Sequence, residues 1–415
     1  MSDSSPPLYV RKLSAIERYN LVINEIVRYN VDAVLEGSGE LDLEQWRRAV
    51  KIAAEANPGT RVRLKSFLGF AKWVDSGITP EVELVSAPEW DGLSEAGTEF
   101  MQSKFDVLNG GPVCDIKLLP GNPARIVFRG LHGAMDARGL THFIEDILRV
   151  LNGEQPIGSR ATITDREIRL EHQDKITATP PPATDAIPAM PVVPPQSDKI
   201  RYIWRRVTVS KNVTNILPKM AVFLAAQARK HASGDVAFTI PVDFRGLRHD
   251  VASTANLTGY LRISVTPEDK PRDVMRRINE QIRQYADCIS PGYLNVLPWM
   301  PIKLLTKSLA DKASDLLHTT NGELPTGGIV SLGHFKAEAL SYPGFTALRG
   351  FGIPGSVGKL NVVIHNYSDG MEVIFSTPES YNREGQLDAL IEQFLETFDP
   401  DAVRNQNEQL STTSA

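Results

Sequence analysis

Residues 176–199 form a proline-rich segment, "ITATPPPATDAIPAMPVVPPQSDK", that has no hydrophobic periodicity. Proline fixes its own φ angle and donates no backbone hydrogen bond, so this segment cannot build a helix or a central strand. About as much patterned chain follows the segment as precedes it. We therefore favour an extended linker between two halves over a disordered insertion. The predicted organisation is an N-terminal lobe at 1–175, the linker at 176–200, a C-terminal lobe at 201–400 and a disordered tail at 401–415.

Length and composition agree with a protein of two cores. A chain of 415 residues is too long for one compact core, and 42% hydrophobic and 23% charged residues are ordinary for a globular protein. The net charge of -5 argues against a nucleic-acid binder. The two cysteines, Cys114 and Cys288, suit neither a disulfide framework nor a zinc site, and no metal site is expected. The start lacks the apolar core of a signal peptide, and no apolar stretch approaches the ~20 residues of a membrane span, so we expect a cytoplasmic protein.

Both halves mix strand and helix patterns, which predicts an α/β fold. In the first half, 31–37, 112–120 and 124–132 read as strands, and 12–28 and 42–56 read as helices. A further helix follows Gly139, with its apolar residues on one face. In the second half, strands are expected at 200–210, 235–247, 257–267 and 327–335, helices at 219–232, 270–287 and 383–398, and a hairpin at 360–378.

A histidine is followed four residues later by an aspartate in two places. In "NVVIHNYSDGMEVIF", His365 belongs to an alternating strand, and Asp369 with Gly370 forms a tight-turn signal. A hairpin accounts for all three residues, so we interpret His365 as one strand position among several. In "ARIVFRGLHGAMDARGLTHFIEDILRVL", His132 instead lies where a strand ends and a helix begins.

Side chains at such a strand-to-helix junction often project into a cleft. Gly133 and Ala134 leave room for a substrate beside His132, and an imidazole with a pKa of ~6.5 suits a general base. The alternative is a histidine that only satisfies backbone groups at a turn. Asp136 could hold the loop or an arginine. The candidate arginines are Arg129, Arg138 and Arg245.

The segment "LHGAMDARGLTHFIEDILRVLNG" resembles the His-His-x-x-x-Asp-Gly motif of the superfamily of condensation domains and thioester-dependent acyltransferases, which includes chloramphenicol acetyltransferase. His132 matches the second histidine and Asp136 the aspartate. "RKLSAIERYNL", "LDLEQWRRAVKIAAEANPGTRVRL", "IPVDFRGL", "NLTGYLRISV" and "GIVSLGHF" resemble further family segments in the same order, so the resemblance spans most of residues 10–398.

The resemblance implies two chloramphenicol-acetyltransferase-like lobes in a V shape with a tunnel between them. It implies an acyltransferase of nonribosomal peptide, polyketide or lipid assembly, with no bound cofactor. The donor would be acyl-CoA or a phosphopantetheinyl carrier protein, and the acceptor an alcohol or amine. His132 would be the general base, and Arg245 would pair with Asp136 to support the motif. Gly133, Gly139, Ser331 and Gly333 would line the tunnel.

The sequence departs from the family motifs at three positions. Leu131 replaces the first histidine, Ala137 replaces the motif glycine, and Leu332 replaces the asparagine of a Ser-Asn-Leu-Gly turn. The first two departures, Leu131 and Ala137, favour an alternative, a non-catalytic protein that holds a thioester or a loaded carrier. A thioester hydrolase is a weaker third possibility. The acyl chain and the acceptor are left open.

Overall fold

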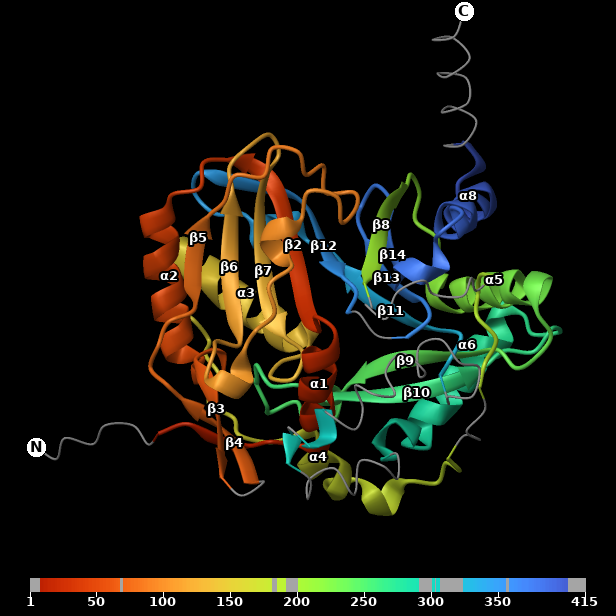
Figure 1. Cartoon of the computed structure of the whole chain (residues 1–415), viewed down its shortest axis with the longest axis horizontal. Helices are drawn as coiled ribbons and strands as arrows, with labels where there is room; N and C mark the ends of the chain where they lie inside the picture. Colours follow the sequence, from red (N-terminus) through yellow and green to blue (C-terminus); the bar gives the residue numbers. More distant parts are fainter. Residues whose placement is uncertain are drawn as a thin grey trace, which may run out of the picture.

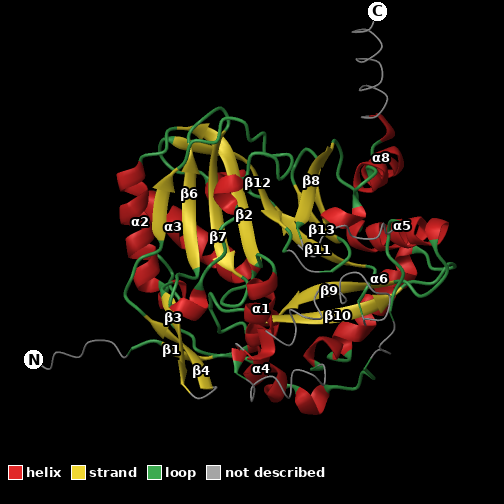
Figure 2. Ribbon diagram, viewed as in Figure 1, coloured by secondary structure: helices red, strands yellow, loops and turns green. Residues whose placement is uncertain are grey.

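The computed structural model describes residues 8–67, 70–180, 185–191, 201–290, 301–302, 304–306, 324–355 and 358–401. Parts of the predicted linker (181–184 and 192–200) and nearly all of the predicted tail (402–415) lie outside these residues. Three β-sheets and the helices that cover them make up a mixed α/β fold, as predicted (Figure 2). Among the described residues, no helix is both long and apolar enough to cross a membrane.

The first half is built on a five-stranded sheet with the order β12-β2-β7-β6-β5. Its strands from this half are β2 (Asn30–Gly39), β5 (Glu81–Leu84), β6 (Cys114–Leu119) and β7 (Ala124–Leu131). Helices α2 (Leu43–Ala56) and α3 (Ala137–Leu151) lay their apolar faces on this sheet and form the first core with it. The predicted cap at the start of α2 is confirmed, because the Asp42 carboxylate accepts a hydrogen bond from the Gln45 amide at 2.8 Å.

Smaller elements complete the first half. A three-stranded sheet contains β1 (Val10–Lys12), β4 (Phe70–Asp75) and β3 (Val62–Phe67). Helix α1 (Ala15–Ile26) begins with a capping box between Ser14 and Glu17, and α4 (Asp165–Glu171) begins with one between Thr164 and Glu167.

The second half is built on a six-stranded sheet with the order β10-β9-β11-β13-β14-β8. These strands are β8 (Tyr202–Val209), β9 (Ala237–Asp243), β10 (Thr258–Ser264), β11 (Gly327–His334), β13 (Asn361–Asn366) and β14 (Met371–Pro378). Helices α5 (Ile216–His231), α6 (Pro271–Arg283) and α8 (Gln386–Phe398) contribute to the second core. The hairpin predicted around Asp369 and Gly370 is confirmed by the antiparallel pairing of β13 with β14.

One strand from the C-terminal half completes the sheet of the N-terminal half. After β11 the chain forms β12 (Phe345–Ile353), which pairs antiparallel with β2, and it then returns to the second sheet as β13 (Figure 1). A third core cluster includes Val34 and Val127 from the first half and Trp204 and Phe351 from the second. The two halves are therefore joined by a shared sheet and a shared core.

Candidate active site

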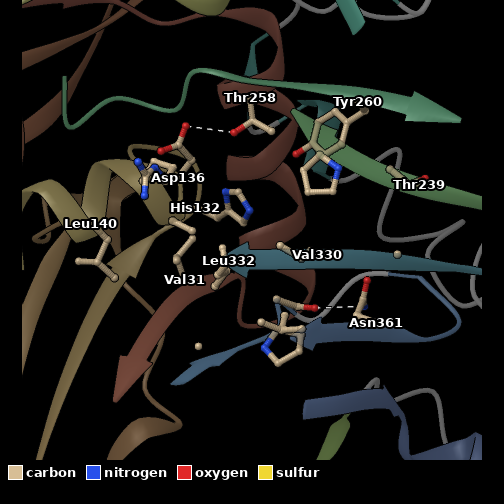
Figure 3. Close-up of a pocket in the computed structure, with 18 of the residues that line it drawn as sticks. Val31, His132, Asp136, Leu140, Thr239, Thr258, Tyr260, Val330, Leu332 and Asn361 are labelled. Atoms are coloured by element: carbon tan, nitrogen blue, oxygen red, sulfur yellow. Dashed lines mark hydrogen bonds between the residues drawn. The ribbon is translucent and has the colours of Figure 1, made fainter. Parts of the chain in front are cut away.

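A cavity of about 1270 Å³ lies between the two halves, and both His132 and Asp136 line it. Pockets for a single small ligand usually have volumes of about 300 to 1,000 Å³. This cavity therefore has room for two reacting substrates. Figure 3 shows the His132 ring among the residues that line it, with strands of the second half on one side.

His132 is held at the junction between β7 and α3 by residues from three places in the chain. Its amide donates a hydrogen bond to the Tyr29 carbonyl at 3.2 Å, and its ring stacks on the Tyr29 ring with 4.8 Å between centroids. The His132 carbonyl accepts hydrogen bonds from the side-chain amides of Asn20, at 3.1 Å, and Asn256, at 2.8 Å. The imidazole Nε2 has no hydrogen-bond partner among the described residues.

The environment of His132 favours a neutral imidazole. Burial lowers the pKa of His132, because the charged form loses its hydration, while a hydrogen bond to its own backbone and the charge of Asp136 act in the opposite direction. The net effect is a lowered pKa. The ring therefore stays unprotonated, and able to accept a proton, at and below neutral pH.

The Asp136 carboxylate accepts hydrogen bonds from residues of both halves. It caps α3 by accepting the Gly139 amide at 2.7 Å, and it accepts the Leu257 amide at 2.7 Å and the Thr258 hydroxyl at 3.0 Å. The Arg245 guanidinium completes the set with two contacts of 3.1 Å. Burial alone would raise the pKa of Asp136, but the charge and hydrogen bonds of Arg245 lower it below its ordinary value. The Asp136 carboxylate is therefore buried, and both of its oxygens accept hydrogen bonds.

Of the three candidate arginines, the structure places Arg245 against Asp136. Arg245 also donates to the Ser253 and Ala255 carbonyls, at 2.9 and 2.7 Å, and these bonds fix its guanidinium. Arg129 instead pairs with Asp115 at 2.5 Å, and Arg138 lies 3.7 Å from Asp243.

The glycines of the motif permit close packing and do not line the cavity. A Cβ on Gly133 would lie 2.7 Å from the Leu21 side chain, and one on Gly139 would lie 2.4 Å from the Thr254 carbonyl oxygen. Ala137 is the first residue of α3 and is not among the described residues with a positive φ, so alanine fits there without strain.

Two backbone amides in the loop after His132 are used in hydrogen bonds within the loop and are not free to donate to a ligand. The amides of Ala134 and Met135 both donate to the Leu131 carbonyl, at 2.8 and 3.1 Å. The Leu131 side chain, which stands where the family motif has its first histidine, is fully buried in the first core.

Ser331 and Gly333 are not among the described residues that line the cavity. Their neighbours Val330, Leu332 and His334 line it, because alternate residues of β11 point to one face. Leu332 is the residue that replaces the asparagine of the family's turn, so an apolar side chain takes that position in the wall.

His365 also lines the cavity, which the hairpin interpretation did not predict. Its Nε2 accepts a hydrogen bond from the Gly352 amide at 2.8 Å, so the ring proton is on Nδ1. Burial, aided by the Arg206 charge, lowers the pKa of His365 to about 4. Because its Nε2 is already occupied, His365 is a poorer candidate for the base than His132.

Sequence patterns did not identify the residues that hold His132 in place. Asn20 lies on α1, Tyr29 precedes β2 and Asn256 precedes β10, so they meet only in the folded chain. No motif or spacing connects them to His132. Among the described residues, no cluster of His, Cys, Asp and Glu is arranged to bind a metal.

Comparison with solved structures identifies the fold. The chain superimposes on the condensation domain of the monacolin K polyketide synthase MokA with a TM-score of 0.63 and 11% identity, covering 94% of this chain and 97% of that one. A variant of the starter condensation domain of rhizomide synthetase RzmA, in complex with C8-CoA, matches with a TM-score of 0.64, 14% identity and 93% of both chains. The epimerization domain of tyrocidine synthetase B matches with a TM-score of 0.57, 14% identity, 95% of this chain and 97% of that one.

No family model and no curated protein matches the sequence. The chain has the fold of the condensation domains, so the resemblance seen in the sequence is confirmed at the level of the fold.

Proposed function

We propose that this protein is an acyltransferase that moves an acyl group from a thioester to an alcohol or an amine. The observation that carries the proposal is the position of His132, whose neutral ring lines a cavity large enough for two substrates. The solved RzmA structure of the same fold holds an acyl-CoA, which supports a thioester donor.

In the proposed reaction, His132 Nε2 takes the proton of the acceptor hydroxyl or amine as the acceptor attacks the thioester carbonyl. A new C–O or C–N bond forms, the C–S bond of the tetrahedral intermediate breaks, and the thiolate leaves with the proton that His132 gives back. Base catalysis of this kind contributes roughly 100- to 10,000-fold, and holding both substrates in one cavity supplies much of the remainder.

Asp136 and Arg245 act on this reaction through His132. Their ion pair fixes the start of α3 against the chain before β10, and Asn256 in that same segment bonds to the His132 carbonyl. The donor in this proposal is acyl-CoA or an acylated phosphopantetheinyl carrier protein, because both present the same thioester arm.

The test compares the wild type with His132→Ala on a panel of acyl thioesters with pooled alcohols and amines. Mass spectrometry follows the acylated product and the free thiol. We expect the wild type to form product and His132→Ala to lose about 100- to 10,000-fold in rate. His231→Ala, an exposed histidine at the end of α5, is the matched control and should keep full activity. Equal product from all three proteins would rule out His132 as the base.

A second candidate function is non-catalytic binding of a thioester or a loaded carrier. The observation that favours it is Leu332, an apolar residue in the cavity wall where the family turn carries a polar asparagine. Tight binding of a loaded carrier without turnover would support this function. Free thiol without acylated acceptor would instead indicate hydrolysis.

A further inference from the structure

The small three-stranded sheet of the first half has one buried face and one exposed face. Trp73 of β4 pairs directly with Leu64 of β3 and with Arg11 of β1, and directly paired residues share a face of a sheet. Trp73 and Val62 are fully buried in the first core, and Arg11 is 1% exposed. This face attaches the sheet to the body of the protein, so the opposite face points to solvent.

Three lysines form a row across the exposed face. Lys72 of β4 pairs directly with Lys12 of β1 and with Lys65 of β3, and all three side chains are exposed. None of them has an ion-pair partner among the described residues. Like charges directly opposite each other destabilise a sheet, so this row costs stability unless an anionic partner neutralises it.

Protection of the sheet edges does not account for the whole row. Lysines on edge strands commonly prevent edge-to-edge aggregation, and β1 and β3 are the edges of this sheet. That role explains Lys12 and Lys65. It does not explain Lys72, because β4 is the central strand.

An exposed aromatic side chain lies at one end of the row. Phe70, the first residue of β4, is two positions from Lys72 and therefore on the same face. Its side chain is 72% exposed, the largest fraction among the large apolar side chains that the structure describes. A single exposed phenylalanine is common, but here the ring stands directly beside a row of unpaired cations.

We call this surface the lysine face, and it consists of Val10, Lys12, Arg63, Lys65, Phe70, Lys72 and Val74. It contains no carboxylate, although the whole chain has a net charge of -5. In Figure 2 the sheet lies at the lower edge of the first half. None of these residues is among those that line the cavity, so the lysine face is separate from the candidate active site.

We propose that the lysine face docks the protein on an anionic lipid surface. The three ammonium groups contact headgroup phosphates, and the Phe70 ring enters the boundary between the headgroups and the acyl chains. An acidic protein would neutralise the lysines without removing the Phe70 ring from water. A lipid surface accounts for both features, because it presents anionic groups directly above an apolar layer.

Cosedimentation of the full chain with lipid vesicles tests the proposal. We expect the wild type to bind vesicles of equal parts phosphatidylcholine and phosphatidylserine, and not vesicles of phosphatidylcholine alone. Binding should weaken as the salt concentration is raised, because dissolved ions screen exposed charges. Failure of the wild type to sediment with the mixed vesicles would overturn the proposal.

Substitutions on the lysine face separate the two contributions. Each lysine near an anionic leaflet strengthens binding by about fivefold, so the combined change Lys12→Gln, Lys65→Gln and Lys72→Gln should weaken it by about 100-fold. Phe70→Ser should weaken it by about tenfold or more, because burial of the ring is lost. The matched control removes three exposed cations from α6 in the second half and should leave vesicle binding unchanged. Its substitutions are Arg272→Gln, Arg276→Gln and Arg283→Gln.

Phe70→Trp reports directly on insertion. Its added tryptophan emission should shift to shorter wavelength when mixed vesicles are added, while the wild-type emission stays constant. Urea denaturation checks that the lysine variant is folded, and removal of the repulsion in the row should leave its midpoint equal to or above that of wild type. If that variant folds poorly, the Phe70→Trp shift tests the proposal without it.

Three further results would overturn the assignment to lipid. An equal loss of binding in the α6 control would mean that only the overall charge matters. Full affinity in Phe70→Ser with none in the lysine variant would mean that the face binds any polyanion, such as an acidic protein. Vesicle binding by Phe70→Trp without a change in its emission would mean that position 70 stays in water.

Discussion

His132 is a histidine whose protonation is controlled by burial. The lowered pKa of His132 predicts how the activity depends on pH. A group whose pKa is lowered stays neutral at more acidic pH, so the base form should persist below the ordinary value of ~6.5. As the pH is lowered, we expect kcat/KM for acyl transfer to fall only at a pH below that at which an ordinary imidazole base becomes protonated. If kcat/KM already falls at a pH well above ~6.5 as the pH is lowered, the pKa of His132 is not lowered by burial.

Asn256 provides a way to change the pKa of His132 without removing the ring. Its side-chain Nδ2 lies 3.3 Å from His132 Nδ1 and 2.8 Å from the His132 carbonyl, and its buried Oδ1 has no partner among the described residues. Asn256→Asp places a negative charge beside the ring, which stabilises the imidazolium and raises the pKa of His132. The acidic limb of the pH-rate profile should move to higher pH. If Asn256→Asp lowers the rate but leaves the acidic limb of the profile at the same pH, Asn256 has a purely structural role.

At the scale of elements, the start of α3 packs closely against the chain that precedes β10. Gly139→Ala would place a methyl group 2.4 Å from the Thr254 carbonyl oxygen, and backbone atoms can yield little there. We expect a loss of about 1 to 3 kcal/mol in the free energy of unfolding, measured by urea denaturation. Gly246→Ala is the control, because nothing lies within 4 Å of a Cβ at that position. Equal losses in both variants would rule out the contact as the cause.

The ion pair between Asp136 and Arg245 is the second link between these elements. Arg245→Met leaves a buried carboxylate without its cation, which should cost about 3 to 5 kcal/mol at neutral pH. Because the pKa of Asp136 is lowered in the folded state, this stabilisation is present above the ordinary carboxyl pKa and is lost as the pH falls through the folded value. The difference between Arg245→Met and wild type in urea denaturation should therefore shrink toward acid pH. A constant difference would mean that the charge of Asp136 is not the cause.

Local patterns predicted most elements, and contacts distant in sequence decided the remainder. The start of α2 at Asp42 and the β13–β14 hairpin follow from a cap residue and from an Asp-Gly turn, both of which act within a few residues. The pairing of β12 with β2 was not predicted, since the glycine-containing segment "FTALRGFGI" lacks a regular alternation. Likewise, His132 and Asp136 stood out by their spacing, while Asn20 and Asn256 reach the site only through the fold.

At the scale of the whole molecule, the shared sheet and the shared core predict that the two halves unfold together. Trp90 of the first half and Trp204 of the second belong to the same core cluster, and Arg206 of β8 bonds to Glu36 of β2 at 2.7 Å and to Glu372 of β14 at 2.9 Å. Unfolding either half alone would expose this core and leave the buried Arg206 without one of its carboxylates. Such a species is costly, so few partly unfolded molecules should accumulate.

We therefore expect a single transition in urea, with the same midpoint by tryptophan fluorescence and by far-ultraviolet circular dichroism. Glu36→Gln should lower that midpoint without splitting the transition, because β12 still completes the first sheet. Two separated transitions in the wild type would mean that each half is stable by itself. The cavity that holds His132 would then have walls from two independently stable bodies. A single transition would mean that the same contacts that stabilise the fold also fix the distance across the cavity, where two substrates must meet.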